Sequence, residues 1–229
     1  MNQAKHREKV VVFDVNETLL DIETLNPFFE RVFGDARVMR QWFAELILYS
    51  QALSLSGNYT EFGKLAAAVL TMVAQIKGVR LQAGDIDDFK DHMRRLPAHQ
   101  DAEPALKILR DAGFRLATLT NSSPDAGKSA LDRAGIAHYF EKQCSVDSVK
   151  RFKPSIETYR SVESALGVEA SSLRLVAAHA WDTLGAIAAG WKSALVTRPG
   201  NAPLPFGNQP DIIENDLLAV ARRIVIEDV

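Results

Sequence analysis

Residues 10–18 read VVVFDVNET, and the expected fold and chemistry of the chain follow from this stretch. The β-branched and aromatic run at 10–13 predicts a buried strand. Asp14 comes directly after it, at the end where parallel α/β sheets carry their catalytic groups. An enzyme that uses Asp14 as a nucleophile would often carry a general acid at position 16 for a leaving oxygen. Asn16 cannot serve as that acid, so we predict a leaving group that needs no proton.

The rest of the chain divides into a purely helical part and a part that alternates. Between about 25 and 96, apolar residues recur at helical spacing without a convincing strand. After Pro97, strand-like runs at 114–120, 173–178 and 192–197 alternate with helical segments at 103–112, 125–134, 156–166, 182–189 and 217–226. This alternation predicts a parallel sheet covered by helices on both faces. We therefore predict an α/β fold, with residues 1–21 and 97–229 as the core and residues 22–96 as an inserted helical cap.

The composition is that of an ordinary globular protein. The 229 residues are 47% apolar and 24% charged, and the net charge of −2 gives no reason to expect a nucleic acid or an anionic membrane as partner. No segment approaches the ~20 apolar residues of a membrane span, and the charged N-terminus lacks a signal region, so we expect a cytoplasmic protein. The single cysteine, Cys144, excludes an internal disulfide and a cysteine metal cluster.

Polar side chains follow the predicted strands at the edge where their carboxyl ends meet. They lie in four groups, which are Asp14 with Thr18, Thr120 with Asn121, Ser122 and Ser123, Lys153 with Pro154, and His179 with Trp181 and Asp182. A carboxylate nucleophile, a lysine, hydroxyls, amides and a second carboxylate form a set suited to covalent catalysis. Each residue alone has a common structural role, as a helix cap, a turn or a solvated loop residue. The combination in this order indicates a catalytic site.

These motifs resemble those of the haloacid dehalogenase superfamily and, within it, of the L-2-haloacid dehalogenase (type II) family. The matching segments are FDVNETL at 13–19, LTNSSP at 119–124, FKP at 152–154 and AAHAWD at 177–182. The resemblance extends from Val10 to the closing helix. It implies a Rossmann-like core with a helical cap inserted after the first strand, in agreement with the pattern of strands and helices.

The resemblance also implies roles for individual residues. Asp14 would attack the halogen-bearing carbon, Lys153 would keep Asp14 ionised, and Asp182 would position or activate the hydrolytic water. Thr18 and Thr120 would orient the Asp14 carboxylate or bind the carboxylate of the substrate. The halide would be received by Arg40, Asn121 and Trp181, and Tyr159 would line the site. The remaining expected site residues are Asn16 and His179.

The implied reaction is the hydrolysis of a short (S)-2-haloacid to the (R)-2-hydroxyacid and halide through an aspartyl ester. It requires one inversion and neither a cofactor nor a metal. The expected partner is a small halogenated carboxylic acid, with fluoroacetate as a candidate. Because the family is often dimeric through its cap helices, we also expect a homodimer.

Two positions depart from the better-known family members, which carry asparagine where this chain has His179 and serine where it has Ala177. A histidine beside the halide or water could add a donor or a base near neutral pH. We hypothesise that it favours a poorly leaving halogen such as fluoride. An unchanged ratio of fluoroacetate to chloroacetate turnover in His179→Asn would contradict this hypothesis.

Three alternatives to a dehalogenase remain open at this stage. A magnesium-dependent phosphatase of the same superfamily would be expected to carry carboxylates where this chain has Asn16 and Ala178, so a hard cation would lack much of its oxygen shell. A non-catalytic binding protein on this fold would bind substrate without releasing halide. A hydrolase of another strained electrophile would turn over acids without halogen.

Overall fold

The computed structural model describes residues 9–228, and its centre is a parallel six-stranded sheet with the strand order β3-β2-β1-β4-β5-β6. The strands are β1 (Val10–Phe13), β2 (Arg115–Thr120), β3 (Lys142–Ser145), β4 (Leu173–Ala177), β5 (Lys192–Val196) and β6 (Ile212–Glu214). Phe13 lies opposite Thr118 on one side and Val176 on the other. This register places Asp14 between the carboxyl ends of β2 and β4, and the predicted α/β fold is confirmed.

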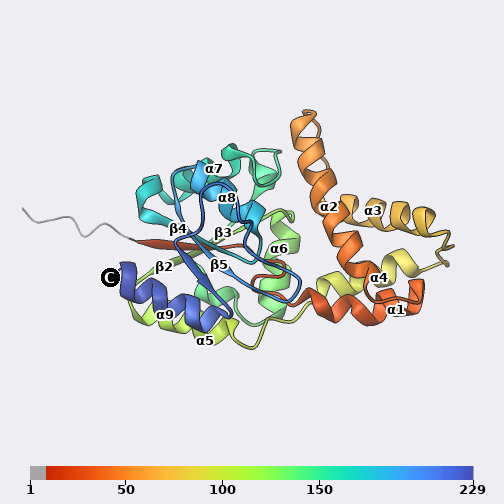
Figure 1. Cartoon of the computed structure of the whole chain (residues 1–229), viewed down its shortest axis with the longest axis horizontal. Helices are drawn as coiled ribbons and strands as arrows, with labels where there is room; N and C mark the ends of the chain where they lie inside the picture. Colours follow the sequence, from red (N-terminus) through yellow and green to blue (C-terminus); the bar gives the residue numbers. More distant parts are fainter. Residues whose placement is uncertain (1–8, 229) are drawn as a thin grey trace, which may run out of the picture.

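Helices cover both faces of the sheet and form a separate group beside it (Figure 1). They are α1 (Asn26–Phe33), α2 (Val38–Leu55), α3 (Phe62–Lys77), α4 (Asp85–Arg94), α5 (Ala102–Asp111), α6 (Pro124–Arg133), α7 (Ile156–Leu166), α8 (Ala180–Ala188) and α9 (Leu217–Asp228). Short 3-10 turns are η1 (Ile22–Leu25), η2 (Ala137–Tyr139), η3 (Val146–Ser148) and η4 (Ala170–Ser172). In Figure 1, α7 and α8 lie on one side of the sheet and α5 and α9 on the other. Among residues 9–228, no helix has the length and apolar character needed to cross a membrane.

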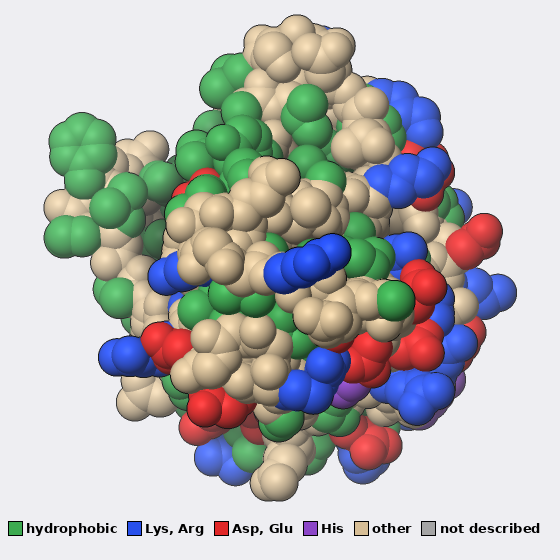
Figure 2. All heavy atoms as spheres, turned by 90° about the vertical axis from the view of Figure 1, so that its right-hand side faces the viewer, with side chains coloured by type: hydrophobic (Ala, Val, Ile, Leu, Met, Phe, Trp, Pro, Cys, Tyr) green, Lys and Arg blue, Asp and Glu red, His purple; other side chains and the backbone are tan. Residues whose placement is uncertain are grey.

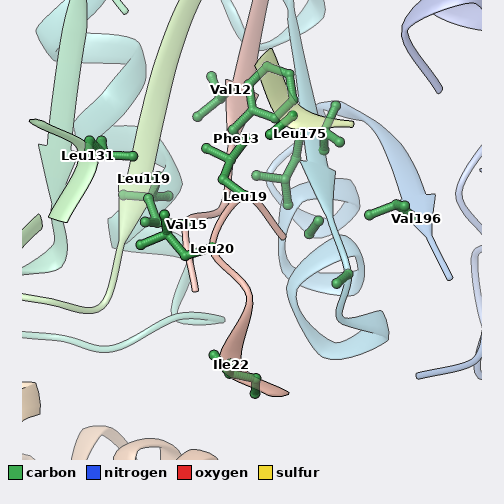
Figure 3. Close-up of a cluster of buried hydrophobic side chains, with 14 of the residues drawn as sticks. Val12, Phe13, Val15, Leu19, Leu20, Ile22, Leu119, Leu131, Leu175 and Val196 are labelled. Atoms are coloured by element: carbon green, nitrogen blue, oxygen red, sulfur yellow. The ribbon is translucent and has the colours of Figure 1, made fainter. Parts of the chain in front are cut away.

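Buried apolar side chains fix the end of β1 that carries Asp14. The residues of β1 and β4 are all buried, as expected for parallel strands that are covered on both faces. Figure 3 shows Phe13 of β1, Leu119 of β2 and Leu175 of β4 among the clustered apolar side chains, with Leu19 and Leu20 from the loop after β1. The backbone that carries Asp14 is therefore packed from both sides.

The helices α1 to α4 have an aromatic core of their own beside the sheet (Figure 1). The fully buried Trp42 lies 5.0 Å from Phe89 and 5.6 Å from Phe29, measured between ring centroids, and its indole N–H donates to the carbonyl of Ala66 at 3.0 Å. The predicted absence of a strand between β1 and β2 agrees with this arrangement. The cap limits of 22 and 96 stay a prediction.

One helix boundary differs from the sequence-based prediction in a way that affects the site. The segment predicted as 182–189 begins at Ala180 in α8, with His179 at the N-cap position in extended conformation. Asp182 therefore lies within the first turn and is free to point toward its neighbours across the sheet edge. Apolar periodicity marks the body of a helix better than its first residue.

Candidate active site

Three buried charges meet beyond the carboxyl ends of β1 and β4. The Lys153 ammonium donates to Asp14 Oδ1 at 2.8 Å, to Asp182 Oδ2 at 2.6 Å and to the Leu119 carbonyl at 3.0 Å. The side chains of Lys153, Asp14 and Asp182 are 1%, 7% and 0% exposed. One lysine thus connects two carboxylates that arrive from different strands.

Thr18 and Asn121 hold this group in position. The Thr18 hydroxyl donates to Asp14 Oδ2 at 2.7 Å and accepts the backbone N–H of Ala178 at 2.8 Å, which ties the carboxylate to the end of β4. Asn121 Oδ1 accepts the backbone N–H of Lys153 at 3.0 Å, so the loop that carries the lysine is anchored to the end of β2.

Tyr159 fixes the second carboxylate. Its hydroxyl donates to Asp182 Oδ1 at 2.6 Å, and the ring is fully buried. Gly185 of α8 makes this approach possible, because a Cβ at this position would lie 2.6 Å from the Cβ of Pro154 and would overlap the Tyr159 ring. The absence of a side chain at Gly185 therefore brings α7 and α8 together at the site.

The charge pairing separates the pKa values of the two carboxylates. Burial would raise the pKa of Asp14, but the Lys153 ammonium and the His179 ring outweigh burial and lower it. At Asp182, burial outweighs the attraction of Lys153, and the pKa is raised. Burial opposes the charge of Lys153, yet the two carboxylates raise its pKa. Asp14 is thus the ionised candidate nucleophile, and Asp182 is the carboxylate that takes up a proton more readily.

A cavity of about 440 Å³ lies between α2 and the loops at the sheet edge, and His179, one of its lining residues, is 3.3 Å from Asp14. Its lining consists of Glu17, Arg40, Phe43, Ala44, Ile47, Leu48, Gln51, His179, Trp181, Gly200 and Asn201. Aromatic and aliphatic side chains of α2 form most of the cap side, and the charged groups are Arg40 of α2 and Glu17 and His179 of the core. This combination is typical of a site for a small molecule with one polar end.

Arg40 reaches into the cavity from α2 and is bound to the core. Its guanidinium pairs with the carboxylates of Glu17 and Glu23, and it donates to the Pro199 carbonyl at 2.7 Å. A Cβ at Gly200 would lie 2.9 Å from Arg40 Cζ, so the small residue leaves room for the guanidinium. Arg40 therefore links the cap to two segments of the core.

His179 lies between the nucleophile and the cavity. Its Nε2 is 2.7 Å from Glu17 Oε2, and its Nδ1 is 3.3 Å from Asp14 Oδ2. The ring stacks on Trp181, with 5.0 Å between centroids, and lies 5.5 Å from the ring of Phe43. Burial would lower the pKa of His179, but its contacts with Asp14 and Glu17 raise it to about 9. The imidazole is therefore positively charged at neutral pH.

The comparisons with known proteins agree with this geometry. Residues 8–190 match the haloacid dehalogenase-like hydrolase family. The chain is 29% identical over 214 residues to the (S)-2-haloacid dehalogenase of Pseudomonas sp. (strain YL), which covers 93% of this chain and 92% of the relative. It is 27% identical over 222 residues to haloacetate dehalogenase H-2 of Moraxella sp. (strain B), which covers 95% and 98%. The structure of L-2-haloacid dehalogenase from Xanthobacter autotrophicus with chloropropionic acid covalently bound has a TM-score of 0.87 and 25% identity, covering 96% of this chain and 99% of that one. The chain belongs to the L-2-haloacid dehalogenase family.

Most of the site residues predicted for this family member lie together. Asp14, Lys153 and Asp182 are in direct contact, with Thr18, Tyr159 and Asn121 bonded to them, and Arg40, His179 and Trp181 line the adjacent cavity. The Trp181 ring lies 5.7 Å from the Lys153 ammonium. The predicted roles of these residues in an L-2-haloacid dehalogenase stay proposals.

Two of the predicted site residues, Thr120 and Asn16, have no side-chain hydrogen bond to Asp14 in the described part of the chain. The Thr120 hydroxyl accepts the backbone N–H of Ser122 at 3.1 Å, and its methyl group faces Gly127 of α6. Asn16 forms an isolated backbone bridge with Leu20. Asn16 lies in the loop after β1, and Thr120, the last residue of β2, stabilises the turn that follows this strand in the L-2-haloacid dehalogenase family member.

The sequence pattern did not assign a role to Glu17, although it lies inside the first motif. In the structure of this L-2-haloacid dehalogenase family member, Glu17 is only 2% exposed, and its carboxylate contacts both His179 and Arg40. The only sequence signal is an acidic residue three positions after the candidate nucleophile. Its contacts depend on long-range folding and could not be read from spacing.

Proposed function

We propose that this protein hydrolyses the carbon–halogen bond of short (S)-2-haloacids and releases halide and the (R)-2-hydroxyacid. The observation that carries the proposal is the buried Lys153 ammonium at 2.8 Å from Asp14 and 2.6 Å from Asp182. It supports an ionised nucleophile and a separate proton acceptor in one site. The relative with covalently bound chloropropionic acid supports the same substrate class.

In the first step, one oxygen of Asp14 donates an electron pair to the C2 atom of the substrate from the side opposite the halogen. The carbon–halogen bond breaks, and the halogen leaves as halide with the bonding pair. No proton is transferred, which is consistent with an amide rather than an acid at Asn16. Thr18 and Lys153 orient the attacking carboxylate through the hydrogen bonds described above.

In the second step, water attacks the carboxyl carbon of the Asp14 ester. Asp182 accepts a proton from this water, which its raised pKa favours, and the proton passes to the departing alkoxide of the hydroxyacid. The remaining proton is lost as Asp14 ionises again beside Lys153. The substrate carbon is inverted once, so an S substrate yields an R product.

The test is halide release from L- and D-2-chloropropionate and from fluoroacetate, with chelator present and with Asp14→Asn as the control. We expect chelator-resistant release from the L isomer that is lost in Asp14→Asn. Release that depends on magnesium, or the absence of release from any of these acids, would contradict the proposal. Phosphate esters assayed in parallel with magnesium address the phosphatase alternative.

We also propose that two copies of the chain associate through the cap helices. Leu55 at the end of α2 is 89% exposed and Ile76 of α3 is 61% exposed, and Figure 2 shows apolar side chains over the upper part of this face. Exposed apolar patches often mark protein interfaces. Sedimentation should show a dimer that Leu55→Glu dissociates, and a monomeric wild type would contradict the proposal.

A further inference from the structure

Lys153 follows a loop that is held partly by the sheet and partly by the helical cap. The backbone N–H of Lys153 donates to Asn121 Oδ1 at the end of β2, at 3.0 Å. The N–H of the preceding residue, Phe152, donates instead to the Ser54 hydroxyl of α2, at 2.8 Å and buried from solvent. Two consecutive backbone donors are thus bound to two different parts of the molecule.

Ser54 contacts the same loop with a second group. Its backbone carbonyl lies in the last turn of α2 and accepts from the Arg151 guanidinium. A cation is favoured at this end of a helix, where the carbonyl groups carry partial negative charge. The hydroxyl and the carbonyl of one cap residue therefore hold Phe152 and Arg151, the two residues that come directly before Lys153.

Aromatic side chains between α2 and α3 support this loop from the cap side. The fully buried Phe152 ring stacks on Tyr59 at 5.0 Å and lies 5.8 Å from Phe62, measured between ring centroids. The Tyr59 hydroxyl donates to Asp147 at 2.9 Å, near the other end of the loop. The backbone that leads to Lys153 is therefore packed against the cap along its length.

The Lys153 ammonium depends on the position of this backbone. All three of its N–H donors are used, by Asp14 at 2.8 Å, Asp182 at 2.6 Å and the Leu119 carbonyl at 3.0 Å. The side chain is 1% exposed, so water cannot replace a contact that is lost. A shift of the backbone at Phe152 would move the ammonium relative to both carboxylates. In an active site, a misplacement of about 1 Å can lower the rate about 10²-fold.

We propose that Ser54 is a positioning residue, which fixes the loop through Phe152 and so sets the ammonium of Lys153 between its two carboxylate partners. The inference rests on the proposed dehalogenation and adds to it a cap residue that acts on the core through the backbone. Within the described chain, Ser54 does not line the cavity. Its effect should therefore fall on kcat and not on KM.

The first test observes the Lys153 ammonium directly, in ¹H–¹⁵N correlation spectra of the ¹⁵N-lysine-labelled protein. The other lysines of residues 9–228 are exposed, so their ammonium protons exchange rapidly with water, and we assign a slowly exchanging signal to Lys153. Ser54→Ala should shift or broaden this signal, because the buried Phe152 N–H loses its acceptor and the loop moves. Ser54→Thr keeps the hydroxyl and should restore most of the wild-type signal.

Ser50→Ala is the matched control. Ser50 is also buried in α2, but its hydroxyl donates to the carbonyl of Ile47 in the same helix, at 2.8 Å. Its substitution should leave the Lys153 signal where it is in the wild type. An unchanged signal in a folded Ser54→Ala variant, or an equal change in Ser50→Ala, would overturn the proposal.

Arg151→Met tests the same link without a buried substitution. The Arg151 side chain is half-buried, and the Ser54 carbonyl still accepts the N–H of Gly57 at 3.3 Å when the guanidinium is removed. We therefore expect this variant to fold and to change the Lys153 signal in the same direction as Ser54→Ala, by a smaller amount. If Ser54→Ala does not fold, an unchanged signal in Arg151→Met would overturn the proposal.

The second test is the steady-state release of chloride from L-2-chloropropionate. Ser54→Ala should lower kcat about tenfold or more with KM within about twofold of wild type, Ser54→Thr should recover most of the lost kcat, and Ser50→Ala should change neither. A raised KM with unchanged kcat would contradict the proposal. Chloride release by the wild type tests the proposed function separately, and if it is absent, the ammonium signal alone decides whether Ser54 positions Lys153.

Discussion

At the residue scale, Lys153 is the centre of the site, because it is the cation shared by two buried carboxylates. Replacing it by a methionine of similar length leaves the buried Asp182 without a counter-charge and Asp14 with only the His179 ring beside it. Leaving buried charges unpaired typically costs about 3–5 kcal/mol. We expect Lys153→Met to lower the free energy of unfolding by this amount and to lower kcat by about 10²–10³-fold or more.

The measurement for this prediction is urea unfolding together with halide release. Lys64→Met is a matched control, because the Lys64 ammonium is paired with Glu61 at 3.0 Å on the exposed surface of α3. Such surface pairs contribute about 0–1 kcal/mol. Equal effects of the two substitutions would contradict the role of Lys153.

His179 makes the stability of the protein depend on pH. Its pKa in the folded protein is raised from 6.5 to about 9, so its contribution is complete below pH 6.5 and is lost as the pH rises through 9. At about 1.4 kcal/mol per unit, this contribution is on the order of 3 kcal/mol. We therefore expect the wild type to lose stability between pH 6.5 and 9 relative to His179→Asn.

Urea unfolding of both proteins across this range measures the difference, since other titrating groups are common to them. Parallel curves for the wild type and His179→Asn would show that the ring is not charged by its neighbours. The same substitution leaves Glu17 without its partner, so the absolute stability of the variant carries less information than its slope with pH.

The sequence predicts which residues belong to the site where these residues lie in a motif at the end of a strand. Asp14, Lys153 and Asp182 follow strands or precede a helix, and the parallel sheet brings such ends together. Thr120 was expected near Asp14, but its hydroxyl accepts from Ser122 instead. The direction of a side chain in a loop depends on backbone angles that the residue types do not determine.

At the element scale, the spacing between α7 and α8 depends on one glycine. A Cβ at Gly185 would lie 2.6 Å from the Cβ of Pro154, next to Lys153 in the chain. We expect Gly185→Ala to destabilise the protein by about 1–3 kcal/mol through overpacking. It should also lower kcat, because Tyr159 and the Lys153 loop must shift away from Asp182.

Gly63 in α3 provides the matched control. A Cβ there would meet nothing within 4 Å, so Gly63→Ala should stabilise the protein by about 0.5–1 kcal/mol through the higher helix propensity of alanine. Thermal unfolding and halide release of the two variants measure both effects. A Gly185→Ala variant as stable and active as wild type would show that α7 and α8 can separate without affecting the site.

The elements themselves could largely be predicted from the sequence, because strands and helices of this fold carry distinct apolar periods. The helix ended by Gly167 is predicted at 156–166, and α7 spans Ile156–Leu166. The first turn of α8 was missed, since His-Ala-Trp carries no capping signal that spacing alone reveals. The predicted start was thus two residues late, although Trp181 and Asp182 were both predicted as site residues from their motif.

At the scale of the whole molecule, the site is formed where the helical group meets the sheet. Arg40 of α2 is bound to Glu17, Glu23 and the Pro199 carbonyl, and the Phe152 N–H donates to the hydroxyl of Ser54 at 2.8 Å. These contacts join the two parts on either side of the cavity. The division into core and insertion could be predicted from the order of helical and strand-like segments along the sequence. The cavity could not, because it depends on contacts between residues far apart in the chain.

The central claim is that Asp14 itself forms the ester and that water then attacks its carboxyl carbon. The most direct measurement is a single turnover of L-2-chloropropionate with excess enzyme in ¹⁸O-labelled water, followed by mass spectrometry of the peptide that contains Asp14. The account predicts one ¹⁸O atom in that peptide and none in the first hydroxyacid formed. An unlabelled peptide with ¹⁸O in the product would mean that water attacks the substrate directly, and it would contradict the account.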